Sequence, residues 1–462
     1  LTGWVLYASM GVDAADFWAQ YDHMYIPELG HNVSVTDYAH TLYIRASWTD
    51  FNPQEDVYGW KIDSNLRAYI EGAYQRNMRL AFRVVVDSRD KRTEFTPQFV
   101  KDAGAKGFMN KGKWSPYSDD PVFQKYYTKF VKALAKDFND PSKVEFIDGF
   151  GLGKWGEYHT MIYSTGDDTP KKAVFDWVTD IYSQAFDKVP VVINYHRWIG
   201  AGKDWVDDEH FAADSEEMLE EAIKKGYSLR HDAFGMTTYY GSWERRFAEK
   251  YRNICPIIME GGWIVKSHNY WQDPRGYRKD SHEDVRRGEF DDSKEAHVNM
   301  MDFRFGDTKS WFKDAFDLVR RFLREGGYRL YPSEISLPLE VSKKTTPTIK
   351  HCWNNLGWGY CPTNIPQWNQ KYKVAFALLD SETNEVRYTF VDTDTDLSKW
   401  IKGSPAEYVF GPDMSKVETG TYVWAVGLVD RSNKDLIGLD IAAKGDILDS
   451  GWLKLSKVSI KK

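Results

Sequence analysis

Hydrophobic positions follow two different periods along the chain, one before and one after residues 326–327. Over residues 1–330, eight short apolar or β-branched runs alternate with longer segments whose apolar residues recur at helical spacing. Continuous apolar runs are typical of parallel strands covered on both faces. The pattern predicts a (β/α)8 TIM barrel over residues 1–330, with its chemistry at the carboxyl ends of the strands. The predicted strands are 4–9, 41–48, 79–86, 145–151, 189–195, 229–235, 254–260 and 302–306.

The clearest predicted helix of this region follows Asp120. Asp120 is a favoured capping residue, and Pro121 suits the first helical turn because it needs no hydrogen-bond donor there. The segment Asn139-Asp140-Pro141 ends the helix. Its apolar stripe consists of Phe123, Tyr127, Phe130, Leu134 and Phe138.

After Gly326-Gly327 the apolar positions alternate with a period of two. This period appears in 372–378 and 422–428, and further strand-like runs cover 386–391 and 452–460. Residues 331–462 are therefore predicted to form an all-β, immunoglobulin-like sandwich. Cys352 and Cys361 lie in a Trp- and Gly-rich loop of this region, and their spacing leaves open whether they form a disulfide.

Composition and charge limit the classes of partner that the protein is expected to bind. The net charge is -7, which gives no broad basic surface for a nucleic acid or an anionic membrane. No apolar run reaches the length of about 20 residues needed to span a bilayer. Aromatic residues make up 16% of the chain, more than a core requires, and their flat faces suit the apolar faces of sugar rings. A carbohydrate partner is therefore expected.

The sequence opens at Leu1 without a signal-peptide pattern. We expect a secreted, periplasmic or cell-surface protein whose signal segment lies outside the given sequence. We also expect a monomer.

Two carboxylates stand out at the predicted strand ends. Glu157 follows the fourth strand in the loop 151–157, and Glu260 ends the seventh strand after a buried apolar run. Strands four and seven lie across the mouth of an eight-fold barrel, so the two groups can face one substrate. Glycoside cleavage with retention needs such a pair, one as proton donor and the other as nucleophile, about 5 Å apart. Other carboxylates near strand ends are Asp87, Asp148, Asp232 and Asp307.

With these carboxylates, the sequence resembles the clan A retaining glycoside hydrolases, and in particular a bacterial group that joins such a barrel to a C-terminal β-sandwich. The resemblance implies Glu157 as acid/base and Glu260 as nucleophile. In clan A an Asn usually precedes the acid/base, whereas Gly156 does so here. Asn194 or His196, at the end of the fifth strand, is the expected replacement. The resemblance rests also on Gly3-Trp4, Arg45-Ala-Ser-Trp48, Phe51-Asn-Pro53, Asp119-Asp-Pro121 and Trp353-Asn-Asn-Leu-Gly357.

Further substrate-binding residues are predicted around this pair. Arg45, at the end of the second strand, is expected to keep the nucleophile ionised, although a purely structural ion pair is equally consistent with its position. The resemblance implies a Tyr that donates to the nucleophile, and Tyr239 and Tyr240 are both candidates. His231 and Asp232 end the sixth strand, and stacking on sugar is expected from some of Trp48, Trp155, Trp198 and Trp263.

The loop after the fourth strand also contains a pattern that resembles a cofactor-binding motif. Gly151, Gly153 and Gly156 match the GxGxxG pattern of dinucleotide-binding loops. A dinucleotide site needs a helix that opens at the last glycine, and none is predicted here. We therefore expect no nicotinamide or flavin cofactor. The sequence also lacks HExxH, paired CxxC and closely spaced histidines, so no catalytic metal is expected.

Two other functions are consistent with the sequence. The barrel could bind a polysaccharide without cleaving it. It could also be an inverting hydrolase that uses Asp148 or Asp232, in which case the two carboxyl groups would stand roughly 6.5 to 9.5 Å apart.

Overall fold

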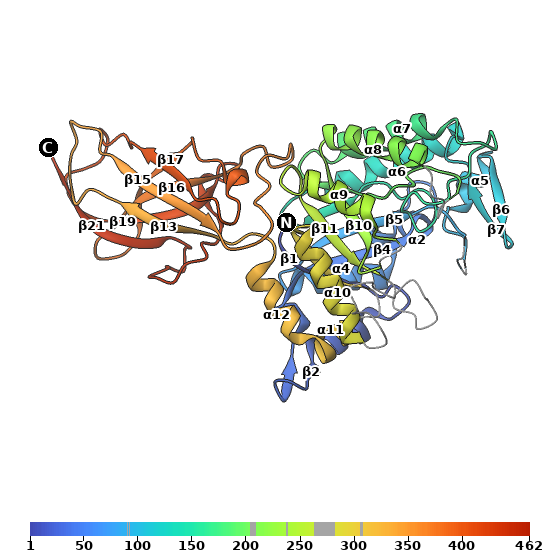
Figure 1. Cartoon of the computed structure of the whole chain (residues 1–462), viewed down its shortest axis with the longest axis horizontal. Helices are drawn as coiled ribbons and strands as arrows, with labels where there is room; N and C mark the ends of the chain where they lie inside the picture. Colours follow the sequence, from blue (N-terminus) through green and yellow to red (C-terminus); the bar gives the residue numbers. More distant parts are fainter. Residues whose placement is uncertain (90, 92, 204–208, 237–238, 263–281, 305–307) are drawn as a thin grey trace. The chain divides into compact units, whose positions relative to one another are not determined.

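The computed structural model describes residues 1–89, 91, 93–203, 209–236, 239–262, 282–304 and 308–462. The chain divides into two compact units, Leu1–Leu323 and Arg324–Lys462. The first unit contains a closed barrel of eight strands in which every pair is parallel (Figure 1). The predicted TIM barrel is therefore confirmed. In barrel order the strands are β1 (Gly3–Tyr7), β4 (Ala39–Ser47), β5 (Arg79–Val85), β8 (Val144–Asp148), β9 (Val191–Asn194), β10 (Tyr227–Phe234), β11 (Ile257–Gly261) and β12 (Met300–Phe303).

Helices follow the barrel strands along the chain. In α6 (Pro121–Phe138), the Asp120 side chain accepts the Phe123 amide N–H at 2.8 Å, and the whole predicted stripe is buried. The other helices of the described residues are α1 (Ala14–Asp22), α2 (Trp48–Phe51), α3 (Gly59–Ile62), α4 (Ser64–Gln75), α5 (Gln98–Asp102), α7 (Lys171–Ala185), α8 (Glu209–Lys224), α9 (Ser242–Tyr251), α10 (His282–Glu295), α11 (Thr308–Asp314) and α12 (Phe316–Glu325), with a 3-10 turn at Val35–Asp37. Two hairpins, β2 (Met24–Ile26) with β3 (His31–Val33) and β6 (Gly107–Asn110) with β7 (Lys113–Pro116), lie outside the barrel sheet.

Charged residues fill the barrel at the level where the strands end. Strand register places Arg45 of β4 beside Arg83 of β5, and Arg83 beside Asp148 of β8. Arg230 of β10 reaches Asp302 of β12 at 2.9 Å. Buried charges are costly unless they are paired, so this layer is stable only as a connected network.

The second unit is all-β, as predicted. One sheet has the order β13-β15-β18, and the other has the order β14-β21-β19-β16-β17, with β20 also paired to β19. The Phe376 and Phe410 rings stack between the sheets at 6.1 Å, so the sheets pack face to face. All pairs are antiparallel except β14 with β21. The strands are β13 (Leu330–Ser336), β14 (Glu340–Ser342), β15 (Ile349–Asn355), β16 (Tyr372–Asp380), β17 (Val386–Asp392), β18 (Ala406–Phe410), β19 (Gly420–Asp430), β20 (Leu436–Leu439) and β21 (Leu453–Lys461), with a 3-10 turn at Leu397–Lys399.

Cys352 and Cys361 are both free thiols in this unit. Among the described residues of the chain, no helix is long and apolar enough to cross a bilayer.

Candidate active site

Glu260 lies at the carboxyl end of strand β11, where the backbone is regular. Its side chain has no exposed surface. Four guanidinium groups surround it. Arg230 and Arg83 donate to Oε2 at 2.8 and 3.3 Å, while Arg304 and Arg45 lie 3.6 and 3.8 Å from Oε1. Within the described residues, Oε1 has no hydrogen-bond partner. One oxygen is thus held by two donors, and the other lies near Arg304 and Arg45 without a hydrogen bond from the described residues.

The charges around Glu260 favour its ionised form. Burial by itself would raise the pKa of this carboxyl, because desolvation penalises the charge. Arg230 and Arg83 oppose that effect most strongly, followed by Arg304 and Arg45, and the pKa of Glu260 falls below its usual range. The expected role of Arg45 in keeping Glu260 ionised is therefore shared with three other arginines.

Arg83 ties the second carboxylate to the first. Its Nε donates to Asp148 at 2.6 Å, its Nη1 donates to Glu157, and its Nη2 reaches Glu260. Arg45 also contacts both glutamates, since its Nη1 lies 3.5 Å from Glu157 Oε1 and 3.8 Å from Glu260 Oε1. Glu157 and Glu260, 103 positions apart in the chain, therefore meet in one cluster.

Glu157 is held by a strained loop rather than by a strand. Trp155 and Tyr158 on either side of it have φ angles of 63° and 65°. Side chains rarely adopt this left-handed region, so the surrounding contacts must hold the loop in place. One such contact is a hydrogen bond of 2.8 Å from the Lys154 amide to the His159 carbonyl.

The glycines of this loop allow its backbone to pack closely against neighbouring segments. This packing explains the GxGxxG pattern. Gly151 has a φ of 84°, and a Cβ there would lie 2.3 Å from the Val84 carbonyl oxygen of β5. Its own carbonyl accepts the Val86 amide at 3.1 Å. The glycines let the loop fold back onto β5, and the chain continues into Glu157 instead of a phosphate-binding helix.

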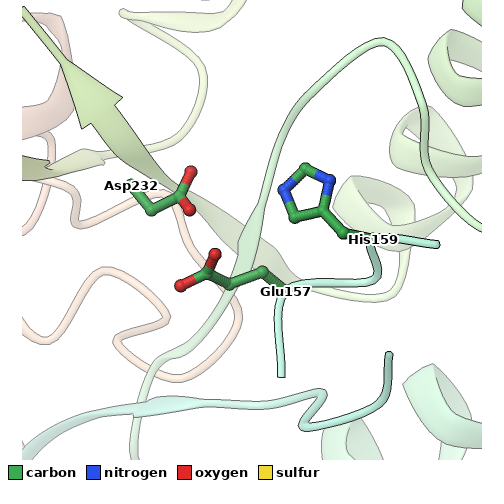
Figure 2. A group of neighbouring side chains, drawn as sticks. All are labelled: Glu157, His159 and Asp232. Carbon is green, nitrogen blue, oxygen red and sulfur yellow. The ribbon is translucent and has the colours of Figure 1, made fainter. Parts of the chain in front are cut away.

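A second carboxyl and a histidine lie beside Glu157. Glu157, His159 and Asp232 offer ligand atoms within 4.8 Å of one another, and all three are buried. Figure 2 shows the carboxyl groups of Glu157 and Asp232 next to each other, with the His159 ring to one side. The two carboxyl groups are joined by a hydrogen bond, so one of them carries a proton.

The position of that proton differs from our expectation. The acid/base role that the resemblance implies for Glu157 led us to expect the proton on this residue. Burial would raise its pKa, but Arg83, the hydrogen bond with Asp232, and Arg45 outweigh burial and lower the pKa of Glu157 below its usual range. Burial and the charge of Glu157 raise the pKa of Asp232 well above its usual range. The resting proton therefore lies mainly on Asp232.

The same three residues are of types that bind metal ions. Two features favour a hydrogen-bonded cluster instead. Arg83 and Arg45 already place positive charge against Glu157. Tyr239 contacts Nε2 of His159, so this ring nitrogen already has a partner. We therefore interpret the trio as a proton-sharing network.

Two further histidines stand behind this network. The Trp198 amide donates to Nδ1 of His196 at 3.1 Å, so the His196 proton lies on Nε2, which donates to the Glu157 carbonyl at 2.9 Å. The Ala233 amide donates to Nδ1 of His231 at 3.0 Å. Burial lowers the pKa of His231 well below its usual range, and the neighbouring histidines add to the effect. Both rings are therefore neutral supports.

Asn194 and the two candidate tyrosines also have defined partners. Asn194 donates to Asp232 at 3.3 Å and thus contacts the acid/base side of the site. Tyr239 contacts His159 on the same side. Tyr240 shares a hydrogen bond of 3.1 Å with Tyr195, and its ring packs under Arg245 of α9. Tyr240 thus packs between β10 and α9, and its contact with substrate stays a prediction.

The predicted tryptophans divide into core and cleft residues. Trp48 has no exposed surface and packs against Phe123 and Tyr127 of α6. Its contact with substrate stays a prediction. Trp198 is also buried, beneath the guanidinium of Arg197. Trp155 is half-buried and lines a cavity. Trp263 lies outside the described residues.

The cavity beside Trp155 has a volume of about 460 Å³. It opens at the ends of β1, β4 and β5 and also reaches Arg304 after β12. Arg45 lines it and contacts both glutamates, so a ligand in the cavity would lie next to the pair.

Sequence reasoning missed several residues of the site. Arg83 and Arg230 lie inside predicted strands, where a charged residue gives no sign of which partner it meets. Arg304 likewise falls inside the predicted strand 302–306, although the observed β12 ends at Phe303. His159 follows a strand end, as Glu157 does, and the same rule could have identified it.

No protein-family model and no curated protein matches the chain. Solved structures with a similar backbone include endo-glycoceramidase II from Rhodococcus sp. (13% identity, 89% of this chain and 97% of that chain covered, TM-score 0.41). They also include a GH30 endoxylanase from Clostridium papyrosolvens (8%, 89% and 94%, TM-score 0.42) and an endoglucanase from Pseudomonas stutzeri (9%, 70% and 94%, TM-score 0.39). At these values the likeness says nothing about chemistry, which has to be argued from the side chains.

Proposed function

We propose that the chain is a retaining glycoside hydrolase that cleaves β-glycosidic bonds in a poly- or oligosaccharide. In the first step Glu260 attacks the anomeric carbon, and the leaving oxygen takes a proton from Glu157. In the second step water gives a proton to Glu157 and attacks the same carbon, which releases Glu260. The proposal needs neither a metal nor an organic cofactor.

One observation carries the proposal: a single nitrogen of Arg45 touches both glutamates. Because Nη1 lies 3.5 Å from one Oε1 and 3.8 Å from the other, these two oxygens are at most about 7 Å apart. Retaining pairs stand about 5 Å apart, and inverting pairs roughly 6.5 to 9.5 Å apart. The bound includes the whole retaining range and little of the inverting range.

The charges support two different roles. Glu260 lies among four guanidinium groups, which suits a group that must be ionised to attack. Glu157 shares a proton with Asp232 across a hydrogen bond, so this pair can supply the proton for the leaving oxygen. Asp232 then acts as a proton store that keeps Glu157 competent.

The inverting alternative through Asp148 has little support. Asp148 accepts hydrogen bonds from Arg83 and Tyr43 and has only 1% of its surface exposed. Both donors hold the Oδ2 atom of Asp148, so we assign Asp148 to the charged layer that positions Arg83. Asp232 is bonded to Glu157 itself, so it serves the same role rather than the opposite one.

The direct test is product analysis on a panel of β-linked glucans, mannans, galactans and xylans. Wild type should release reducing sugar of retained anomeric configuration, as read by proton NMR in the first minutes of reaction. Glu260→Gln should release none. A matched control is Glu217→Gln, on the exposed face of α8. Inverted product would overturn the retaining mechanism, and binding without release by the wild type would favour the non-catalytic alternative.

A further inference from the structure

The cavity beside the two glutamates has a largely apolar lining. Its described lining residues include three half-buried side chains that are apolar or aromatic, those of Met10, Phe95 and Trp155. They also include the buried side chains of Ala8, Ala46 and Val85. A ligand in the cavity would therefore meet mainly carbon atoms, and part of that surface is aromatic.

The guanidinium groups that line the cavity are already balanced by carboxylates. Arg45 lies 3.5 Å from Glu157 and 3.8 Å from Glu260, and Arg304 lies 3.6 Å from Glu260. These charges therefore do not require an anionic ligand. The two arginine side chains are 17% and 21% exposed, and a guanidinium plane stacks well on an aromatic ring.

Hydrogen-bond acceptors for a sugar are scarce in the described lining. The side chains that bear an oxygen there are those of Tyr7, Ser47 and Asp50. Ser47 Oγ accepts the Asp50 amide at 2.9 Å, and Asp50 Oδ2 accepts the Ser47 amide at 3.1 Å. The Tyr7 hydroxyl accepts a hydrogen bond of 3.2 Å from Arg45. A buried sugar unit has several hydroxyl groups that need such partners, whereas an aromatic group needs none.

Hydrogen bonds of the backbone hold the two half-buried rings in place. The Phe95 amide donates to Ser88 Oγ at 2.8 Å, and the Phe95 carbonyl accepts the Thr49 amide at 2.9 Å. The Trp155 carbonyl accepts a hydrogen bond of 2.9 Å from Arg45. A ligand would thus meet a preformed aromatic surface, which lowers the entropic cost of binding.

We propose that this cavity binds an aromatic group carried by the substrate, next to the Glu157–Glu260 pair. Rings and guanidinium planes are the surfaces that attract a π-system. The group is an aryl aglycone or an aromatic acyl ester on the sugar, since both present the same ring. The inference rests on the proposed function and deepens it, because it names a substituent of the cleaved glycoside. Phe95 and Met10 are the specificity-determining residues.

Matched substrates with and without an aromatic ring test the proposal. One arm compares benzyl with cyclohexylmethyl β-glycosides of glucose, mannose, galactose and xylose, whose leaving alcohols have similar acidity. The other arm compares methyl β-glycosides of the same sugars that carry one benzoyl or one cyclohexanecarbonyl ester. In at least one arm, wild-type kcat/KM should be about five-fold or more higher on the aromatic member. The arm that responds identifies the source of the ring. Equal or faster cleavage of the saturated member in both arms would overturn the proposal.

Phe95→Leu tests the ring contact. It keeps an apolar side chain but removes the ring that lies 5.3 Å from the Lys91 ammonium, so the aromatic-to-saturated ratio of kcat/KM should fall below about two-fold. The matched control is Tyr58→Leu, which removes a half-buried ring 5.7 Å from the Lys61 ammonium, outside the cavity lining. The control should keep the wild-type ratio. A wild-type ratio in Phe95→Leu as well would overturn the assignment, whereas a loss of stability alone would lower both rates and leave the ratio unchanged.

Met10→Trp tests the place of the ring and does not depend on how Phe95→Leu folds. Met10 is half-buried, and a bulkier side chain there would fill part of the volume of about 460 Å³. The preference for the ring-bearing substrate over the plain methyl glycoside should fall about ten-fold, because the space for the ring is lost. An unchanged preference would place the ring outside this cavity and overturn the proposal.

Binding measurements separate this inference from the proposed function. If the wild type cleaves glycans with retention but shows no aromatic preference, the hydrolase proposal stands and the cavity assignment fails. If nothing is cleaved, calorimetric titration of the wild type with the same compounds decides. Tighter binding of an aromatic member than of its saturated partner then supports the cavity assignment, although the hydrolase proposal fails. No binding of any aromatic member, or equal binding within each pair, overturns the cavity assignment.

Discussion

The two halves of the candidate site are built in opposite ways. Glu260 ends a regular buried strand, and four guanidinium groups contact it. Glu157 lies on a loop with left-handed residues on both sides and is bonded to another carboxyl group. Glu260, at the end of the strand, is kept ionised by the surrounding guanidinium groups. Glu157, on the loop, lies where it can exchange a proton with the neighbouring carboxyl group.

This difference matters because retaining hydrolysis needs two unlike carboxyl groups. Two glutamates in similar surroundings would titrate as a coupled pair with no defined roles. Here arginines lower the pKa of Glu260, whereas Glu157 and Asp232 share a proton that rests mainly on Asp232. Substitutions in each half of the site should therefore have different effects.

The largest effect is expected from Glu260→Ala. Removal of the attacking group should lower kcat at least about 10⁴-fold on every substrate, since no other group can form the intermediate. Sodium azide should restore turnover of an activated aryl glycoside and give a glycosyl azide of inverted configuration. The measurements are initial rates and product NMR. An azide product of retained configuration, or undiminished turnover, would place the nucleophile elsewhere.

Glu157→Ala should have an effect that depends on the leaving group. Natural substrates need a proton on the departing oxygen, and their kcat/KM should fall by about 10² to 10⁴-fold. An activated aryl glycoside needs little protonation and should lose much less. Equal losses on both substrate types would contradict the acid/base role and remove the functional contrast between loop and strand.

The barrel was predictable because its strands are continuous apolar runs with helical segments between them. The predicted run 145–151 corresponds to β8, and 254–260 to β11, with ends displaced by one to three residues. The position of Glu157 after one strand and of Glu260 at the end of another then followed from barrel geometry alone.

The electrostatics of the site could not be predicted in the same way. Whether Glu157 or Asp232 holds the proton depends on distances to Arg83 and Arg45, which sit on two other strands. The burial of Trp48 depends on α6, whose residues are far from it in sequence. Local pattern identifies the strand end at which a side chain lies but not which charges or rings it meets there.

Asp232→Asn should change the pH profile more than the maximal rate. In the wild type, the repulsion between two adjacent carboxyl groups keeps a proton on the pair to higher pH. Without it, Arg83 and Arg45 would ionise Glu157 at lower pH. The alkaline limb of kcat/KM on a natural substrate should therefore move down by at least about one pH unit, and activity at pH 7 should fall about ten-fold. Asp187→Asn, on the exposed surface, is the control. An unmoved alkaline limb would mean that Asp232 holds structure but not the proton.

The smallest effect is expected on stability. It tests the half of the site around Glu260 through the buried carboxyl group of Asp302. Burial and the charge of Glu260 raise the pKa of Asp302 to about 7, although Arg230 opposes the shift. A folded-state pKa above the unfolded value of 3.8 means that the folded protein holds a proton that the unfolded chain releases. The resulting stabilisation is complete below about pH 4 and is lost as pH rises through 7.

Asp302→Asn keeps the group neutral and removes this dependence. Urea unfolding of both proteins at several values between pH 5 and 8 gives a difference curve in which contributions from other groups cancel, including the opposite one from His231. The free energy of unfolding of the wild type, relative to the variant, should fall by about 1 kcal/mol per pH unit up to pH 7 and then level off. Asp317→Asn, on the exposed side of α12, should give a flat difference. A flat curve for Asp302→Asn as well would mean that Arg230 fully neutralises Asp302, and that the four arginines around Glu260 carry less uncompensated charge than the site geometry implies.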